Sequence, residues 1–466
     1  MELSPSQSYA LSSILERKSG FLTGSSGTGK SAVLGIAVTQ LRAKSLKVVV
    51  TATTGNAAVL IGGSTIHSVM KLFPNEAKSL DEWRSVACSR VRTTPFYKKA
   101  LREIDVLVID EASMLDPDAL DVIDAQLRTA RTPEPWGGVQ MILCGDLCQL
   151  PPISKTGFLF DSKCFWDGVS EMWDLKEIFR QSDPVFCGIL QRMRFGLNTP
   201  EDILLLKSRE HAILESPTRL FSKNNGVDGV NTFHLNELGS PVVTLDCVQG
   251  VVVKVKHPSD KQIELLQSQG TKILSDLHLP ATMPLKIGAV VMLASNLDVS
   301  NGYSNGARGT IIGFKCGDEK FDVEGMKTRT DERFRYPAWN LPVVEFANGK
   351  KMQIPYVKWE RGIPGLGEAF VWHMPLRLAW ATSIHRSQGQ TLNNVSISLD
   401  DVFETGQAYV AISRATSLEG LVFSAFDPNA IRAHPRITEF YTKSFTMQRA
   451  AKLGVTDDMT DHHEST

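Results

Sequence analysis

The sequence is poor in the features that mark several special classes of protein. Its seven cysteines are scattered and form no CxxC pair, which argues against a disulfide framework or a zinc ribbon and indicates a reducing, intracellular compartment. No apolar run approaches the roughly 18 to 20 residues of a membrane helix, and the N-terminus has no basic-then-apolar signal peptide. Lys and Arg total 50 against 51 Asp and Glu, so the net charge of −1 gives no general sign of a polyanionic partner or a membrane.

The composition is that of a folded globular protein, with 42% hydrophobic and 22% charged residues among 466. Strand and helix patterns alternate in the first half. We expect helices over residues 5–18 and 31–43, and strands over residues 20–23, 47–52, 105–109 and 139–144. This alternation is typical of a parallel sheet with helices on both faces, so we predict an α/β fold.

The pattern changes between residues 285 and 354, where Asn-Gly pairs at 301, 305 and 348 separate short apolar runs. Asn-Gly favours hairpin turns because both residues accept positive φ, so we expect a small antiparallel barrel here. After Pro375 the α/β pattern returns, with strands at 395–399 and 421–423 and a helix at 404–413. This return predicts a second α/β domain that the barrel interrupts.

A glycine-rich loop is the first candidate site. The segment Gly24-Ser-Ser-Gly-Thr-Gly-Lys30-Ser31 fits GxxxxGK[ST] in full, after an expected strand and at the start of an expected helix. Glycines let backbone N–H groups surround phosphates, Lys30 brings a charge to the β- and γ-phosphates, and the Ser31 hydroxyl is expected to bind Mg²⁺. The expected nucleotide contacts are Gly24, Ser25, Gly27, Thr28, Gly29, Lys30 and Ser31. The alternative is a Gly/Ser turn that fits the pattern by chance.

Two further strands end in polar residues. Val106-Leu-Val-Ile-Asp110-Glu111 places two carboxylates at the carboxyl end of a strand, where ligands bind in open α/β sheets. We expect Asp110 to hold Mg²⁺ through water and Glu111 to orient and deprotonate an attacking water, which favours hydrolysis. The third strand leads to Gln149, which is expected beside the γ-phosphate. A solvated Asp-Glu loop and a structural turn before the proline pair are the alternatives.

With these motifs in order, the sequence resembles helicases of superfamily one, B branch, and specifically the petite-integration-frequency (Pif) family of DNA helicases. The resemblance runs from about Leu3 to Tyr441. Its further stretches are Leu3–Gln7 (the Q motif), Thr51–Ala58 with Ile61–Ser68 (motif Ia), Leu175–Gln181 with Arg192–Gly196 (motif IV and the adjoining signature), Leu285–Leu293 with Asn305–Gly313 (the start of the barrel insertion), Ala379–Gly389 (motif V) and Gly406–Ala415 (motif VI). The sequence departs from the family pattern at Asn56, Arg386 and Gln390, and lacks the aromatic residue often found before Gln149.

The resemblance implies a nucleotide site that two domains form together. It places Gln7 on the adenine of ATP, and Gln388 and Gly389 beside the nucleotide. Arg180 and Arg414 are implied as arginine fingers from the second motor domain, which stabilise charge on the γ-phosphate and are worth roughly 10³ to 10⁵ in rate. From the residues alone, Gln7 is also an ordinary N-terminal helix residue, and an isolated arginine is usually a surface ion-pair partner. The implied cofactors are ATP and Mg²⁺.

The family also implies the architecture, which is two tandem RecA-like P-loop NTPase domains with a small wedge insertion and an SH3-like β-barrel insertion. We expect motor domain 1A at residues 1–66 and 104–170, and the wedge insertion 1B at 67–103. Motor domain 2A is expected at 171–284 and 375–430, and the barrel 2B at 285–374. Residues 431–466 are expected to form a C-terminal helix and a frayed acidic tail.

A motor of this kind grips a single strand across both α/β domains through phosphate contacts. Candidate DNA-binding residues by motif position are Thr54, Gly55, Thr65, His67, Ser383, His385, Arg386 and Ser387. A hydrogen-bonded structural role is the alternative for each His. Residues 84–102 contain six basic residues and no acid, so we expect phosphate attraction there, with Phe96 as a wedge or stacking residue. A solvated basic face with Phe96 in the core is the alternative.

The family implies an ATP-dependent helicase that translocates 5′ to 3′ on single-stranded DNA while the wedge insertion splits the duplex. Implied substrates are duplex, forked, RNA-DNA hybrid or G-quadruplex structures in DNA repair, replication and recombination. Implied partners are single-stranded DNA and DNA junctions, and no membrane. We expect a monomer in the absence of DNA, located in the nucleus or mitochondrion if eukaryotic and in the cytoplasm if bacterial or phage.

Three rival classes make different predictions. A P-loop kinase or nucleotide switch needs an acceptor pocket or an Asn-Lys-x-Asp tetrapeptide, which the sequence lacks, and gives the second α/β domain no role. A non-catalytic nucleic-acid-binding module does not need Lys30, Asp110 and Glu111 together. An RNA or mixed-substrate helicase of the same superfamily is not separated by sequence, because phosphate contacts and stacking tolerate every base.

Overall fold

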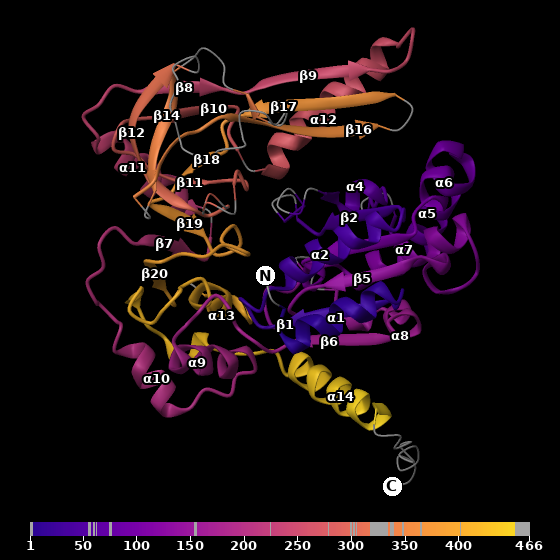
Figure 1. Ribbon diagram of the computed structural model, residues 1–466, viewed down its shortest axis with the longest axis horizontal. Coiled ribbons are helices and arrows are strands. Elements are labelled where there is room, and N and C mark those ends of the chain that lie inside the picture. The colour runs from indigo at the N-terminus through magenta and orange to yellow at the C-terminus, as the bar shows by residue number, and fades with distance from the viewer. Residues whose placement is uncertain are drawn as a thin grey trace.

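The computed structural model describes residues 3–54, 57–58, 61, 63–73, 77–152, 156–223, 225–277, 279–298, 301, 303, 305–316, 334–335, 340–346, 349–363, 366–400 and 402–452. Two α/β lobes lie side by side, and a third body of antiparallel strands lies beyond the second lobe (Figure 1). None of the helices in these ranges is both long and apolar enough to span a bilayer.

Motor domain 1A is built on a parallel sheet of six strands in the order β3-β2-β4-β5-β1-β6. Alternate residues of its central strands pack on opposite faces, so Val106 and Val108 contact α1 and α2, whereas Leu107 and Ile109 contact α7 and α8. The strands are β1 (Gly20–Gly24), β2 (Val48–Ala52), β3 (Ser64–Thr65), β4 (Val106–Asp110), β5 (Gln140–Cys144) and β6 (Glu171–Leu175). The helices are α1 (Pro5–Leu15), α2 (Lys30–Ala43), α7 (Pro117–Ala130) and α8 (Lys163–Gly168), with 3₁₀ turns η2 (Ala112–Met114), η3 (Pro135–Gly138) and η4 (Leu159–Asp161). These elements confirm the α/β prediction for the first half.

Insertion 1B consists of α4 (Ile66–Val69), α5 (Leu80–Thr93) and α6 (Pro95–Arg102). The side chain of Phe96 is 68% exposed, so the alternative in which it packs into the core is wrong. The next residue, Tyr97, is buried and donates its hydroxyl proton to the Met70 carbonyl at 2.8 Å. Arg84 pairs with Asp121 at 2.9 Å and Arg102 donates to the Ala130 carbonyl at 2.8 Å, so part of the basic segment is used to fasten 1B to 1A.

Motor domain 2A has a parallel sheet of four strands in the order β19-β7-β20-β21. Its strands are β7 (Thr218–Phe221), β19 (Ala381–Ser383), β20 (Val395–Ser398) and β21 (Leu421–Ala425). Its helices are α9 (Pro184–Arg194), α10 (Pro200–Lys207), α11 (Asn225–Glu237) and α13 (Gln407–Ile412), with the 3₁₀ turn η7 (Pro428–Ala430). The parallel pairing of β7 with β20 confirms that the α/β pattern resumes after an interruption.

The interruption, body 2B, is antiparallel throughout its described strands. A sheet of order β15-β14-β12-β11-β18 faces a second sheet of order β13-β16-β17-β9, and β10 pairs with β8. The Asn305-Gly306 pair forms a turn near the end of the connection between β11 and β12, with Gly306 at φ +85° as an Asn-Gly pair favours. Of the pair at 348, Gly349 has φ +75°, whereas Asn348 lies outside the described residues. The elements are β8 (Val243–Asp246), β9 (Val248–Val253), α12 (Asp260–Leu277), β10 (Thr282–Leu285), β11 (Val290–Leu293), β12 (Arg308–Cys316), β13 (Phe334–Arg335), β14 (Asn340–Phe346), β15 (Lys351–Gln353), β16 (Tyr356–Ile363), β17 (Gly367–His373) and β18 (Leu376–Leu378).

Two expected domain limits need correction. Strand β6 pairs with β1 along its whole length, so 1A extends to Leu175 and not to residue 170. Strands β8 and β9 and helix α12 were expected in 2A, but β9 pairs with β17, and Leu245 and Ile273 lie in one hydrophobic core with the barrel strands. We therefore place residues from about 243 onward with 2B.

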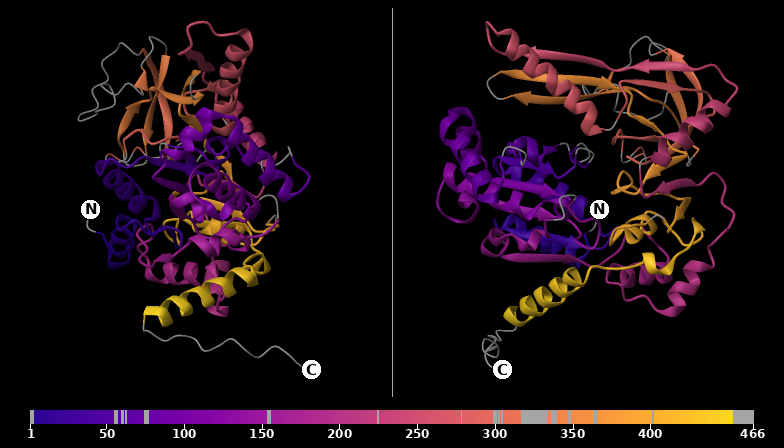
Figure 2. Two further views of the ribbon diagram at one scale, coloured as in Figure 1. Left: turned by 90° about the vertical axis from the view of Figure 1, so that its right-hand side faces the viewer. Right: turned by 180° about the vertical axis from the view of Figure 1, so that it is seen from behind.

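Helix α14 (Pro435–Lys452) leaves 2A and returns across the underside of 1A, as Figure 2 shows from behind. Its residues Ile437, Phe440 and Tyr441 are buried in the core of 1A. Two chain segments therefore connect the lobes on one side, namely the linker after β6 and the linker before α14. The acidic tail expected after this helix lies outside the described residues.

Candidate active site

The glycine-rich loop lies at the carboxyl end of β1 and leads into α2. Its glycines have positive φ, +85° at Gly27 and +79° at Gly29, and a Cβ at Gly27 would lie only 2.6 Å from the Cβ of Arg180. Glycine is therefore needed both for the turn and for the close approach of the second lobe. Lys30 is the first residue of α2, and its ammonium donates to the carbonyls of Gly24 at 2.8 Å and Ser25 at 3.1 Å.

The two carboxylates lie at the end of β4, on the same edge of the sheet. Glu111 has a left-handed backbone with φ +52°, and its N–H donates to Asp110 Oδ1 at 2.9 Å. Burial raises the pKa of Asp110. Burial first, and then the neighbouring Asp110, raise the pKa of Glu111 to about 7. Glu111 therefore changes protonation near neutral pH, as a general base for water requires.

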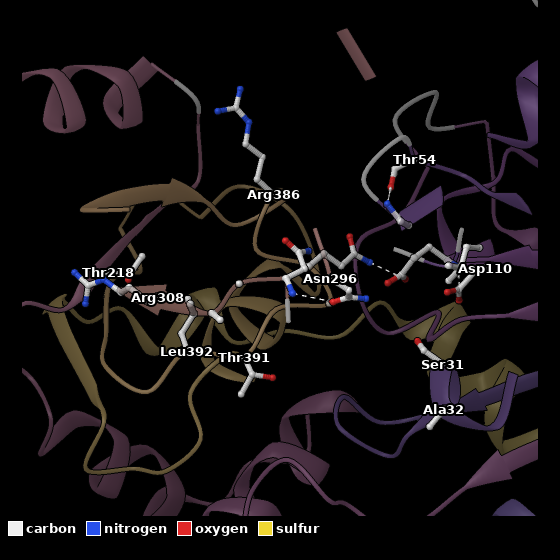
Figure 3. Close-up of a pocket in the computed structure, with 18 of the residues that line it drawn as sticks. Ser31, Ala32, Thr54, Asp110, Thr218, Asn296, Arg308, Arg386, Thr391 and Leu392 are labelled. Carbon is white, nitrogen blue, oxygen red and sulfur yellow. Dashed lines mark hydrogen bonds between the residues drawn. The ribbon is translucent and has the colours of Figure 1, made fainter. Parts of the chain in front are cut away.

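Ser31 and Asp110 line one cleft of 1490 Å³ between the lobes (Figure 3). Mg²⁺ is usually held by one or two protein oxygens together with substrate phosphates and waters. One hydroxyl and one carboxylate beside a phosphate loop fit this pattern. In the described part of the chain, no group of three or more His, Cys, Asp or Glu residues is placed to hold a metal ion.

Gln388 of the second lobe reaches the carboxylates of the first. Its amide Nε2 donates to Glu111 Oε2 at 3.0 Å and to Gln149 Oε1 at 3.3 Å. Gln149 lies close to 2A, since a Cβ added at Gly406 would be only 2.5 Å from the Gln149 carbonyl oxygen. Gln388 was expected beside the nucleotide, and the structure adds that it joins two residues of the hydrolytic set. Gly389 follows it on the cleft wall.

The two arginines expected as fingers meet at one hydroxyl of the glycine-rich loop. Arg180 Nη1 donates to Ser26 Oγ at 2.6 Å, and Arg414 Nη2 donates to the same oxygen at 2.8 Å. Arg414 is only 1% exposed, and burial, followed by the nearby Arg180, lowers its pKa to about 9. Burial also lowers the pKa of Arg180. Both guanidinium groups remain charged at neutral pH, so two cations face the loop with a neutral partner between them.

Gln7 lies against the same loop from α1. Its Nε2 donates to the Thr28 carbonyl at 3.0 Å, and its Oε1 accepts the N–H of Ser4 in a capping box at the start of the helix. Phe179, which the sequence analysis missed, lies nearby with its side chain 59% exposed and its N–H donating to the Gly27 carbonyl at 2.9 Å. The signal that could have found Phe179 in the sequence is an aromatic residue directly before the candidate finger Arg180.

Three more residues of the seam were missed. The N–H of Ser26 donates to the Tyr409 hydroxyl at 2.9 Å, and this hydroxyl lies 3.4 Å from Asp146 Oδ2. Asp146 forms a buried ion pair with Arg194 at 3.0 Å. Asp146 lies two residues after β5 and Arg194 lies within the signature stretch Arg192–Gly196, but only the folded chain brings the two side chains together.

The expected DNA contacts fall into two groups. Thr65 precedes α4 as its N-cap and His67 lies within it, where burial lowers the pKa of the imidazole. Thr54 lines the cleft and its hydroxyl accepts the N–H of Ala57 at 3.2 Å. Gly55 lies outside the described residues. None of these positions conflicts with the expected strand path, which stays a prediction.

In the second lobe, two of the expected hydroxyl contacts are used internally. Ser387 Oγ donates to the Ile384 carbonyl at 2.7 Å, and Ser383 Oγ accepts the N–H of Arg386 at 3.3 Å. Both serines are buried in this conformation, and their expected phosphate contacts stay a prediction. Arg386 extends away from Ser31 and Asp110 (Figure 3), and His385 lines the cleft with a pKa that burial lowers.

One parallel sheet carries a phosphate loop, and arginines that come with a second parallel sheet of the same chain meet this loop. This arrangement defines a class of protein. It is the class of P-loop NTPases whose site lies at the seam of two RecA-like domains. Comparison with known proteins identifies the family within this class. A family model described as PIF1-like helicase matches residues 2–186, and a model of the 2B domain of DNA helicase Pif1 matches residues 278–314.

The "ATP-dependent DNA helicase PIF1" of Xenopus laevis is 36% identical over 99% of this chain, which spans 67% of that relative. The human relative is spanned over 65% of its length. Among solved structures, Pif1 helicase from Candida albicans matches with 31% identity and a TM-score of 0.70, covering 96% of this chain and 100% of that one. Bacteroides sp Pif1 in complex with ADP-AlF4 matches with 26% identity and a TM-score of 0.74, covering 96% and 98%. The chain belongs to the PIF1-like family of ATP-dependent DNA helicases.

Proposed function

We propose that this chain is an ATP-driven motor that translocates 5′ to 3′ on single-stranded DNA and unwinds DNA ahead of it. The observation that supports this most directly is the meeting of Arg180 and Arg414 with the glycine-rich loop at Ser26. Because these arginines come from the second lobe, hydrolysis depends on closure of the seam. Closure and release of the seam are the movement that drives translocation.

The site residues divide the chemistry as follows. Lys30 and the backbone of residues 24–29 bind the phosphates, and Ser31 with Asp110 holds Mg²⁺, which neutralises charge on the phosphates when bound. Glu111 removes a proton from the attacking water, and Gln388 holds its carboxylate in place through the bond at 3.0 Å. Arg180 and Arg414 stabilise the charge that develops on the transferred phosphoryl group. Gln149 lies where it senses the γ-phosphate and passes the change to 2A through Gln388.

The adenine pocket is proposed at the edge of α1. Gln7 supplies an amide at the glycine-rich loop, and the exposed ring of Phe179 supplies a flat apolar face next to Gly29, whose added Cβ would be 3.9 Å from Phe179 Cδ2. An amide and an aromatic face are the two elements that a purine needs for hydrogen bonding and stacking. Gln7 therefore reads the base edge, and Phe179 stacks against the ring.

The DNA strand is proposed to cross the lobes past Thr54, Thr65 and His67, and then His385 and Arg386. The structure of Bacteroides Pif1 bound to single-stranded DNA, with 26% identity and a TM-score of 0.62, supports this class of ligand. Forks, RNA-DNA hybrids and G-quadruplexes are the proposed substrates. One chain supplies both halves of the seam, so we propose a monomer in the absence of DNA. The proposed compartment is the nucleus or mitochondrion if the organism is eukaryotic, and the cytoplasm if it is bacterial or phage.

Strand displacement with ATP tests the proposal, using duplexes with either a 5′ or a 3′ single-stranded tail of DNA or of RNA. We expect displacement from the 5′-tailed DNA substrate, and none by Lys30→Ala or Glu111→Gln. Activity on 3′ tails alone would overturn the direction. Equal activity on both RNA tails and none on DNA would favour the RNA helicase, and undiminished single-strand-stimulated ATP hydrolysis in both variants would end the motor proposal.

A further inference from the structure

Ser26 is the point at which the two lobes make their polar contact beside the phosphate loop. Its hydroxyl oxygen has two lone pairs, and each accepts one guanidinium N–H, from Arg180 at 2.6 Å and from Arg414 at 2.8 Å. Its backbone N–H donates to the Tyr409 hydroxyl at 2.9 Å. One residue of 1A is therefore bonded to three residues of the opposite side of the seam.

The chain segments that carry the two arginines are bonded to each other through Gln181. Gln181 is buried directly after Arg180, and its Nε2 donates to the carbonyls of Ser413 at 3.2 Å and Ala415 at 2.9 Å. Arg414 donates to the Ser413 hydroxyl at 2.9 Å and to the Val410 carbonyl at 2.9 Å. When the lobes separate, these bonds travel with 2A, whereas the bonds to Ser26 must break.

We propose that Ser26 is a positioning residue whose hydroxyl holds Arg180 and Arg414 at the phosphate loop in the nucleotide-free protein, until a phosphate of the bound nucleotide takes over their donors. This inference rests on the proposed function, since it concerns the fingers of that site. A phosphate oxygen is an anionic acceptor, and hydrogen bonds between two ionised groups are shorter and stronger than those to a neutral hydroxyl. The exchange from Ser26 to phosphate is therefore favourable.

Ser26 and the nucleotide phosphate stabilise closure in different states of the seam. In the nucleotide-free state Ser26 stabilises closure, and in the bound state the phosphate does so. Loss of the hydroxyl therefore raises the free energy of the free protein and leaves the complex little changed. Nucleotide then binds more tightly although the free seam opens, a combination that a general packing defect does not produce.

The test compares Ser26→Ala with Ser26→Thr, which keeps a hydroxyl, and with Ser13→Ala, which removes a buried hydroxyl on α1 that has no hydrogen-bond partner among the described residues. Donor and acceptor dyes are placed through unnatural amino acids at the exposed positions Gln40 and Glu201, one on each lobe. Energy transfer reports seam closure in the full chain, first without nucleotide and then with ADP and aluminium fluoride. The dissociation constant of a non-hydrolysable ATP analogue is measured on the same proteins.

Without nucleotide, we expect the ratio of closed to open Ser26→Ala protein to fall at least about fivefold, which is the effect of losing roughly one net hydrogen bond of the two that the hydroxyl accepts, with recovery in Ser26→Thr and no change in Ser13→Ala. With ADP and aluminium fluoride, all four proteins should close equally, and Ser26→Ala should bind the analogue more tightly. A Ser26→Ala protein that stays closed without nucleotide, stays open with it, or binds the analogue more weakly would overturn the proposal. None of these readouts needs turnover, so they fail or succeed separately from the hydrolysis tests of the motor.

Discussion

At the scale of single residues, the site depends on a carboxylate whose surroundings oppose its charge. Glu111 is buried beside Asp110, and both effects raise its pKa, to about 7. Gln388 acts in the other direction, because a donor to a carboxylate stabilises its charged form. The balance leaves Glu111 basic enough to take a proton from water and still largely ionised just above neutral pH.

This balance predicts the pH dependence of hydrolysis. Because Glu111 must be deprotonated to act, kcat/KM for ATP should rise with pH through about 7 and level off above it. Removal of the donor in Gln388→Ala should move this rise to higher pH, since the charged carboxylate loses a partner. Initial rates measured from about pH 5.5 to 9 in the presence of single-stranded DNA show both effects. A flat profile across neutral pH, or a shift to lower pH in Gln388→Ala, would contradict the assignment of Glu111.

The sequence allowed prediction of the site residues that lie within one motif. Lys30 and Ser31 are fixed by the loop pattern, and Asp110 and Glu111 by their place after a buried strand. Ser26 lies 154 positions from Arg180 and 388 from Arg414, so its role follows from the seam and not from its neighbours. The burial of Ser383 and Ser387 could not be predicted either, because motif position does not tell which way a side chain points.

At the scale of elements, insertion 1B presents one aromatic side chain from a short helix. Phe96 is the second residue of α6 and is 68% exposed, while Tyr97 beside it is buried and bonds the Met70 carbonyl after α4. An exposed ring on a fastened helix suits a wedge that stacks on a base where the strands part. The same exposure means that the ring contributes little to folding.

Phe96→Ala should therefore reduce strand displacement about tenfold, as expected from roughly 1 to 3 kcal/mol of stacking per base, and leave single-strand-stimulated ATP hydrolysis intact. Leu204→Ala, which removes an equally exposed side chain on α10 of the other lobe, is the matched control and should change neither rate. Equal losses of displacement and hydrolysis in Phe96→Ala would mean that the ring serves the motor and not the separation of strands.

Helix α14 fastens the end of 2A to the sheet of 1A. The Tyr441 hydroxyl lies 2.7 Å from Thr23 Oγ1 and accepts the N–H of Leu147 at 3.2 Å, next to the ends of β1 and β5. Tyr441→Phe leaves a buried N–H without this acceptor, so we expect it to lower the free energy of unfolding by about 1 kcal/mol in urea. Tyr9→Phe, whose hydroxyl bonds Glu171 at the surface, should change it by less than about 0.5 kcal/mol. Equal values for both variants would contradict a fastening role for Tyr441.

The helices and strands could be predicted from the sequence, but which strands pair with one another was less predictable. The continuous apolar runs of β4 and β5 identified both strands and their place in a parallel sheet. For strands β6 and β9, nothing local tells that β6 completes the sheet of 1A or that β9 pairs with β17. The expected domain limits moved for this reason, since register and pairing are decided by long-range contacts.

At the scale of the whole molecule, two lobes are connected on one side and meet at a nucleotide site on the other. The first lobe supplies the loop, the proposed metal ligands and the proposed base, and the second supplies Arg180, Arg414 and Gln388. Body 2B extends from the second lobe and reaches over the first (Figure 1). ATP hydrolysis at the seam can therefore change the distance between the proposed DNA contacts of the two lobes.

We propose that residues of both lobes act on one phosphate, and single-turnover ATP hydrolysis at saturating single-stranded DNA is the sharpest test of this arrangement. Arg180→Ala and Arg414→Ala should each slow hydrolysis by about 10³-fold or more while nucleotide still binds, whereas Arg219→Ala, an exposed arginine on the same lobe, should not. Hydrolysis at the native rate in both finger variants would contradict the account.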